Sequence, residues 1–177
     1  MDQHISLESV INFLVATPLF QGLDASERGD VARIMEVQRL DDGERVFHEG
    51  DDGDAWYVVF EGEAQVRKHT SSGNGEIARL TPGACFGEMA LLDGMPRSAT
   101  VIASGPLTVF RFRRTRFDGL LDRGSLGAYK LVAAMARTLS QRQRRLTHQV
   151  SELLAEREPP YARATLVDTV DRHRVFE

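Results

Sequence analysis

The sequence has 177 residues, 42% of them hydrophobic, and a formal net charge of -4 at pH 7. This length and composition predict one well-packed domain with a short appended element. The acidic balance disfavours direct DNA binding, which needs a basic surface that displaces counterions from phosphates. Cys85 is the single cysteine and excludes an internal disulfide, so we expect a protein of the reducing cytoplasm.

Residues 5 to 35 have the periodicity of helices. Pro18 and Gly22 interrupt the pattern, and Asp24 is a good N-cap residue for a second helix. The apolar run from Val10 to Phe20 is too short to span a bilayer and is preceded by acidic rather than basic residues. We therefore predict a buried helix here and no contact with a membrane.

Residues 36 to 112 form short apolar or alternating runs separated by turn residues. Seven such runs are countable, and their letters are VQRL, ERVFHEG, AWYVVFEG, EAQVRKH, GEIARL, SATVIA and LTVFRF. Turn-forming residues gather at residues 41–43, 50–53, 61–63, 71–75 and 81–83. Many short strands at regular spacing favour a closed β architecture. The predicted fold is α+β, with an antiparallel, jelly-roll-like β-roll flanked by N-terminal helices and a long C-terminal helix.

The helical period returns after Arg113, with a short helix that ends near Gly124. Ser125 can cap a long helix that runs to about Glu158 and stops at the following two prolines. We therefore predict one domain over residues 1–158, including its helices, and a tail over residues 159–177 to which we assign no structure.

An apolar seam marks the long helix, with residues at steps of 3, 4, 7 and 7 and Arg142 interrupting one position. Its members are Val132, Met135, Leu139, Leu146 and Leu153. The seam is typical of a helix that pairs with a second copy of the chain. A helix that packs on its own roll has the same pattern, so both interpretations stay open.

The segment FGEMALLDGMPRSATV, from Phe86 to Val101, has the composition of an anion site. Gly87 permits a tight turn, and good helix formers follow it, so a short helix would present unpaired N–H groups. Arg97 stands just before an apolar strand, where its guanidinium can bind phosphate oxygens in a bidentate way. Ser98 adds a hydroxyl donor.

Glu88 narrows the chemistry of this segment. A carboxylate at an anion site repels the anion unless it faces another part of the ligand, such as a sugar hydroxyl. One hydroxyl acceptor and one guanidinium, Arg97, fit a ribose with a cyclic phosphate, and the sequence has no GxxxxGK[ST] motif for polyphosphates. Taken singly, Glu88 also fits a carboxylate that balances a helix dipole, and Arg97 fits a surface ion pair.

FGE-x-A-L-L followed by P-R-S-A-T-V resembles the phosphate-binding cassette of cyclic-nucleotide-binding domains. Catabolite activator protein, protein kinase A regulatory subunits and cyclic-nucleotide-gated channels share it. The resemblance covers residues 18 to about 150, including PLFQGLDASE, FHEGDDGDAWYVVFEGEAQV and MARTLSQRQ. It implies that Gly87 and the following N–H groups contact the cyclic phosphate, Glu88 accepts from the ribose 2′-hydroxyl, and Arg97 neutralises the phosphate. The implied site residues are Phe86, Gly87, Glu88, Met89, Ala90, Arg97, Ser98 and Ala99.

The base contacts depart from the family pattern. Where the catabolite activator presents two hydroxyl side chains to adenine, this chain has Arg142 and Gln143. Arg142 can stack on the purine and Gln143 can bond a base edge, or both can belong to a solvated helix face. Cyclic AMP is favoured over cyclic GMP, because no threonine replaces Ser98 or Ala99 as in many GMP-selective relatives.

These patterns predict a cyclic-nucleotide receptor rather than an enzyme, with no cofactor and no metal. A cupin-type enzyme would need paired histidines and a carboxylate, and His48 and His69 lie apart. We expect ligand binding to move the C-terminal helix and to signal to a protein partner that the sequence does not name. The alternative is a scaffold or sensor with the same fold that works without a ligand.

Overall fold

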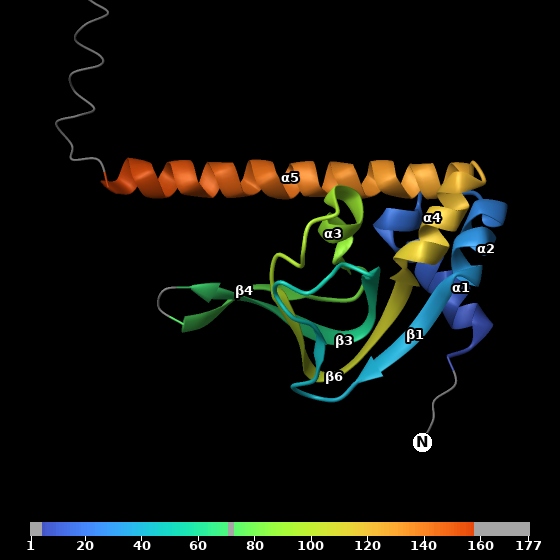
Figure 1. Ribbon diagram of the computed structural model, residues 1–177, viewed down its shortest axis with the longest axis horizontal. Coiled ribbons are helices and arrows are strands. Elements are labelled where there is room, and N and C mark those ends of the chain that lie inside the picture. Colours follow the sequence, from blue (N-terminus) through green and yellow to red (C-terminus); the bar gives the residue numbers. More distant parts are fainter. Residues whose placement is uncertain (1–4, 71–72, 158–177) are drawn as a thin grey trace, which may run out of the picture. The chain divides into compact units, whose positions relative to one another are not determined.

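The computed structural model describes residues 5–70 and 73–157 (Figure 1). The chain divides into two compact units, Met1–Met135 and Ala136–Glu177. The first unit contains the sheet, the N-terminal helices and the start of the long C-terminal helix. The described part of the second unit is the rest of that helix.

Helical elements open the chain as predicted: α1 (Leu7–Ala16), the 3-10 helix η1 (Pro18–Phe20) and α2 (Ala25–Arg33). Asp24 caps α2 reciprocally with Glu27. The Glu27 N–H donates to Asp24 Oδ1 at 2.9 Å, and the Asp24 N–H donates to Glu27 Oε2 at 2.8 Å. The N-cap predicted at Asp24 is therefore confirmed.

The strands form a six-stranded antiparallel sheet in the order β1-β6-β3-β4, with β2 paired to β6 and β5 to β3. The strands are β1 (Met35–Leu40), β2 (Arg45–Phe47), β3 (Ala55–Thr70), β4 (Gly73–Leu80), β5 (Cys85–Phe86) and β6 (Thr100–Arg113). The sheet curls into a roll, and α1, α2 and α4 gather at the end where β1 begins and β6 ends (Figure 1). The predicted fold class is confirmed.

The predicted count of seven strands is wrong, because two predicted pairs of runs are continuous and β5 is additional. The turn expected at residues 61–63 is instead a bulge within β3, where the register against β6 shifts. Gly62 has φ +84°, and a Cβ there would lie 2.2 Å from the Pro106 carbonyl oxygen. The glycine bends one strand against its neighbour and does not reverse the chain. Gly105, with φ +79°, bends β6 in the same way.

The two faces of the central strands bury different cores. Trp56 and Val58 of β3 pack with the helices, whereas Tyr57 and Val59 point into the roll. This follows from the alternation of side chains along a strand. Trp56 stacks on Phe112 with ring centroids 4.0 Å apart and planes 9° apart. Because both faces are covered, this part of β3 is an unbroken apolar run, AWYVVF.

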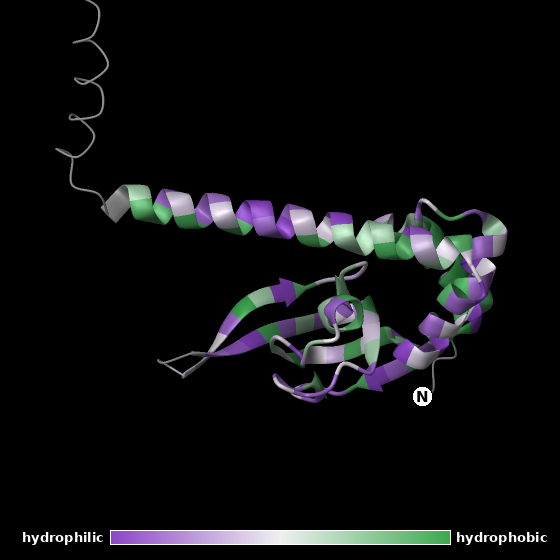
Figure 2. Ribbon diagram, turned by 45° about the horizontal axis from the view of Figure 1, so that its top comes forward, coloured by the Kyte–Doolittle hydropathy of each residue, from purple (hydrophilic) through white to green (hydrophobic). Residues whose placement is uncertain are grey.

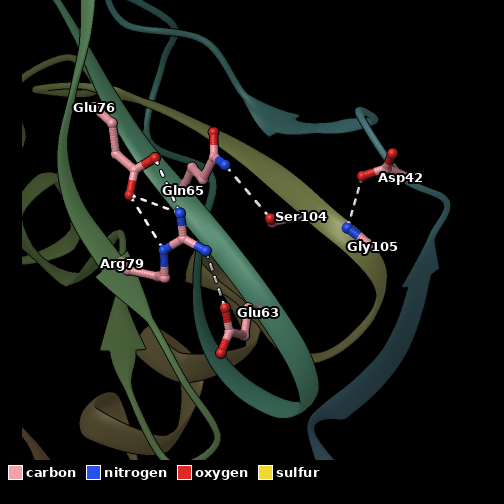
Figure 3. Close-up of polar contacts among 7 residues, drawn as sticks. All are labelled: Asp42, Glu63, Gln65, Glu76, Arg79, Ser104 and Gly105. Atoms are coloured by element: carbon pink, nitrogen blue, oxygen red, sulfur yellow. Dashed lines mark hydrogen bonds and ion pairs between the residues drawn. The ribbon is translucent and has the colours of Figure 1, made fainter.

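Polar contacts lie within the hairpin of β3 and β4 and between this hairpin and β6 (Figure 3). Arg79 of β4 donates to Glu63 at 3.3 Å and to Glu76 at 3.2 Å. Hydrogen bonds to Glu63 and then to Glu76 raise the pKa of Arg79 above its ordinary value. Beside them, the Gln65 amide donates to the Ser104 hydroxyl at 3.4 Å. These ion pairs and hydrogen bonds therefore connect β3 with β4 and with β6.

Two helices close the described chain: α4 (Arg114–Asp122) and α5 (Leu126–Arg157). Ser125 caps α5 as predicted, since the Ala128 N–H donates to its hydroxyl at 3.4 Å. Lys130 donates to both carboxylate oxygens of Glu27, at 2.7 and 2.8 Å. A Cβ on Gly127 would lie 2.9 Å from the Glu27 Cβ. The first turns of α5 therefore pack tightly on the start of α2.

The second unit presents a mixed helix surface in which apolar and polar residues alternate along α5 (Figure 2). Four large apolar side chains on it are more than half exposed: Leu146, Val150, Leu153 and Leu154. Leu146 and Leu153 are members of the predicted seam, and Val150 and Leu154 lie close to it in the sequence. Pro159, Pro160 and the rest of the predicted tail lie outside the described residues.

Candidate functional site

The predicted cassette folds as strand, glycine turn and short helix. Gly87 follows β5 with φ +73°, and α3 (Glu88–Asp93) begins directly after it. Only glycine adopts this left-handed conformation without strain. A Cβ on Gly87 would also lie 2.7 Å from a guanidinium nitrogen of Arg97. The local backbone and the arginine therefore depend on the same glycine.

Arg97 is buried, with 1% of its side chain exposed. Its Nη1 donates to the Gly87 carbonyl at 2.9 Å, and its Nη2 donates to the Ala55 carbonyl at 2.7 Å. Nη2 also lies 3.4 Å from Oδ1 of Asp54. Burial lowers the pKa of Arg97 below its ordinary value, because water no longer solvates the charge. The guanidinium stays charged, and its orientation is fixed by these three partners.

Aromatic rings support the Arg97 guanidinium from the roll interior. Its carbon Cζ lies 4.2 Å from the ring centroid of Phe47 and 5.7 Å from that of Tyr57. Burial raises the pKa of the Tyr57 hydroxyl. Among the described residues, Arg97 Nε is buried and has no hydrogen-bond partner. A buried donor of this kind is costly unless an acceptor reaches it.

Asp54 joins two arginines at the site. Its carboxylate pairs with Arg97 and with Arg111 of β6. Its carbonyl accepts from the Arg114 N–H at 2.7 Å. Arg114, the first residue of α4, is thus hydrogen-bonded to Asp54, which orients Arg97.

The loop before β3 packs against the cassette. The Gly50 N–H donates to the Arg97 carbonyl at 2.9 Å, and the Arg97 N–H donates to the Asp51 carbonyl at 2.8 Å. A Cβ on Gly53 would lie 2.3 Å from the Ala90 Cβ. The turn predicted at residues 50–53 therefore also packs against α3 and holds the Arg97 backbone.

The remaining predicted cassette residues divide by exposure. Glu88 is 3% exposed, and three other residues of the predicted cassette are also buried: Phe86, Ala90 and Ala99. Met89 is 44% exposed. Ser98 is exposed, and its hydroxyl lies 3.8 Å from the Met89 sulfur. The cassette therefore buries its carboxylate and guanidinium and leaves a hydroxyl at the surface.

The predicted base contacts belong to the second unit. Arg142 and Gln143 lie on the exposed part of α5. The Gln143 carbonyl accepts from the Thr147 hydroxyl at 3.0 Å. Their role in binding stays a prediction.

Sequence reasoning missed three residues that hold Arg97: Phe47, Tyr57 and Asp54. The alternation of side chains indicates that the two aromatics face the roll interior, but no local pattern links them to Arg97. Asp54 has none, because it is one of several acidic residues in the turn GDDGD.

Two surface hollows lie on other parts of the first unit. One, of about 370 Å³, is polar and is lined by residues of β1 and β2 and the turn between them, including Arg39 and Arg45. The other, of about 450 Å³, is mainly apolar and lies between α1 and α2. Neither hollow is lined by a cassette residue.

Comparison with known proteins agrees with this geometry. Residues 37–124 match the family described as "Cyclic nucleotide-binding domain". The chain belongs to the cyclic nucleotide-binding domain family. The predicted resemblance is thereby confirmed, and the family is regulatory rather than catalytic.

Relatives of this domain include kinase regulators. The chain is 39% identical over 101 residues to a cAMP-dependent protein kinase regulatory subunit from Mycosarcoma maydis, covering 57% of this chain and 19% of that protein. The regulatory domain of Toxoplasma gondii PKA, crystallised with cAMP, has a TM-score of 0.66 at 29% identity, covering 76% of this chain and 49% of that one. The chain thus spans half or less of these two proteins.

A bacterial structure matches over more of its length. A cyclic nucleotide-binding domain from Methylobacillus flagellatus KT has a TM-score of 0.71 at 26% identity, covering 86% of this chain and 84% of that one.

Within residues 5–70 and 73–157, no helix is long and apolar enough to cross a bilayer. The same residues hold no cluster of three or more His, Cys, Asp or Glu that could bind a metal.

Proposed function

We propose that this cyclic nucleotide-binding domain binds cAMP at the cassette between Phe86 and Ala99. The observation that carries the proposal is Arg97. Its buried guanidinium is oriented by two backbone carbonyls and Asp54, and its Nε donor has no partner among the described residues. A phosphate oxygen would supply the acceptor that this donor needs.

The rest of the cassette fits the other parts of the ligand. Glu88 is a buried carboxylate one residue from Gly87, and it would accept from the ribose 2′-hydroxyl. Backbone N–H groups after Gly87, together with the Ser98 hydroxyl, would share the cyclic phosphate with Arg97. The ligand would therefore be held by its sugar and phosphate before its base is read.

Two observations favour cAMP over cGMP. The kinase relative from Mycosarcoma maydis is named for its cAMP dependence, and the Toxoplasma gondii relative was crystallised with cAMP. Residues 98 and 99 are serine and alanine, whereas many GMP-selective relatives have a threonine at one of these positions. Arg142 and Gln143 would read the base, by stacking and by a hydrogen bond.

The output would pass through α5 to a protein partner in the cytoplasm. The contact of Lys130 and Gly127 with Glu27 joins the start of α5 to α2. Displacement of one helix would therefore displace the other. Further along α5, the exposed apolar residues from Leu146 to Leu154 are suited to a partner helix, either of another protein or of a second copy.

Calorimetric titration of the chain with cAMP and with cGMP tests the proposal. We expect tighter binding of cAMP. Arg97→Lys keeps the charge but loses the donor fork, and should weaken cAMP binding at least about tenfold. Arg113→Lys is a matched control, because the Arg113 side chain is half exposed and pairs with Glu36 at 2.9 Å.

Thermal unfolding provides an independent readout. Ligand at 100 times its dissociation constant should stabilise the domain by about 2.7 kcal/mol. Absence of a shift with either nucleotide would reject the proposal and favour a ligand-independent scaffold. Equal weakening by Arg97→Lys and Arg113→Lys would reject the assigned role of Arg97.

A further inference from the structure

Lys68 of β3 lies next to the cassette, with its Nζ 2.6 Å from the Ser98 carbonyl oxygen. Ala64 is buried in the roll interior and Val66 packs against the same core. Side chains alternate along a strand, so Lys68 belongs to the same row. The β3–β6 register pairs Arg67 with Thr100, which places Lys68 beside the end of the cassette.

The Lys68 ammonium group joins three segments of the chain. Its Nζ donates to the Ser98 carbonyl at 2.6 Å and to Glu49 Oε1 at 2.9 Å. The other carboxylate oxygen of Glu49 accepts from the His69 N–H at 3.1 Å. The Glu49 N–H donates to the Thr100 hydroxyl at 2.9 Å. We call this set of contacts the Lys68 clasp.

The clasp adds little net charge to the site. The ammonium group and the Glu49 carboxylate are paired, so their fields largely cancel at a distance. The hydrogen bond from Lys68, and then that from the His69 N–H, lower the pKa of Glu49 below its ordinary value of 4.5. The carboxylate therefore stays ionised at neutral pH, and the clasp can hold a peptide group without becoming a second anion site.

Ser98 is the residue that this peptide group positions. The preceding residue, Arg97, is fixed through its N–H and carbonyl by the loop before β3. The Ser98 carbonyl is fixed by Lys68, whereas the Ser98 side chain is exposed. The backbone that carries the Ser98 hydroxyl is thus held on both sides.

We propose that Lys68, together with Glu49, is a positioning residue that directs the Ser98 hydroxyl at one of the two exocyclic oxygens of the cyclic phosphate. This inference rests on the proposed function. A hydroxyl aimed at one oxygen distinguishes the two diastereomers of a cyclic phosphorothioate, in which sulfur replaces one or the other oxygen. The Lys68 clasp therefore contributes to phosphate stereoselectivity.

The first experiment compares cAMP with its Sp and Rp phosphorothioates by calorimetry, for the unchanged chain and for Lys68→Met. We expect a loss of about threefold to tenfold in cAMP affinity, the size of one hydrogen bond, and a smaller ratio between the diastereomers. Lys68→Arg should restore part of both. Arg79→Met is the matched control, since it removes a cation from the same hairpin whose partners are Glu63 and Glu76 (Figure 3).

A double-mutant cycle separates positioning from general stability. If Lys68 acts through Ser98, Lys68→Met should have little further effect in a Ser98→Ala background. Additive losses, an unchanged diastereomer ratio, or equal effects of Lys68→Met and Arg79→Met would overturn the inference and leave the proposed function intact. Failure of the unchanged chain to bind any of the three nucleotides would overturn both.

Discussion

Two arginines are proposed to contact the same ligand, and they differ in how the fold holds them. Arg97 is 3% exposed and is fixed by the carbonyls of Gly87 and Ala55 and by Asp54. Arg142 lies on the exposed part of α5, in the second unit. Packing sets the geometry of the first arginine before a ligand arrives. The second lies on an exposed helix surface, where packing does not fix its geometry to the same degree.

Gly87→Ala should have the largest effect on stability and on binding, because the added methyl group would displace the buried Arg97 guanidinium. The substitution forces a side chain into a left-handed backbone and places its Cβ 2.7 Å from an Arg97 nitrogen. We expect a loss of about 2–4 kcal/mol in the free energy of unfolding and a loss of cAMP binding of at least about tenfold. Chemical denaturation and calorimetry measure the two.

Gly94→Ala is the control for backbone strain alone. Gly94 has φ +71°, but a Cβ there would lie 3.9 Å from its nearest neighbour, Arg114 Nη2. It should cost about 1–2 kcal/mol of stability and leave Arg97 in place. If both variants bind cAMP equally, the guanidinium does not depend on Gly87.

Arg142→Gln tests the other side of the comparison. We expect it to weaken cAMP binding by about threefold or less, since an exposed cation–π contact contributes little, and to leave stability unchanged. The ratio of cAMP to cGMP affinity is the sharper readout. A tenfold loss from Arg142→Gln would show that the exposed arginine is as important as the buried one.

Acid should break the Lys68 clasp, and we expect this effect on stability to be smaller than the effects of Gly87→Ala and Arg142→Gln on binding. The pKa of Glu49 is lowered in the folded state, so its contribution to stability is complete above its ordinary pKa of 4.5 and is lost as pH falls through the lowered value. Unfolding curves of the unchanged chain and of Glu49→Gln should therefore converge below that pH. A constant difference between them down to acid pH would show that the Glu49 charge plays no part.

How much could be predicted from sequence depended on how local the signal was. Gly87, Glu88 and Arg97 lie within one short segment, so the sequence alone was enough to predict their chemistry and the family. The cap at Asp24 rests on residues three apart and was predicted as well. Glycine-containing turns were less certain, since Gly62 looks like a turn residue and only its contact with Pro106 makes it a bulge.

The supports of the site were not predictable, because they come from distant parts of the chain. Phe47 and Tyr57 look like ordinary core aromatics until Arg97 is found against them. Lys68 contacts Ser98 across a separation of 30 residues, which no local pattern encodes. Side-chain alternation gives the face of a strand, but only the register of the sheet gives the neighbour.

Trp56 is the only tryptophan of the chain, and it is fully buried between the roll and the helices. It stacks on Phe112 and meets the Phe117 ring of α4 edge-on at 5.7 Å. Its indole N–H has no acceptor within the described part of the protein. The protein thus contains an intrinsic fluorophore at the joint between sheet and helix. A shift of α4 would change its emission, so helix movement can be followed in solution without attaching a dye.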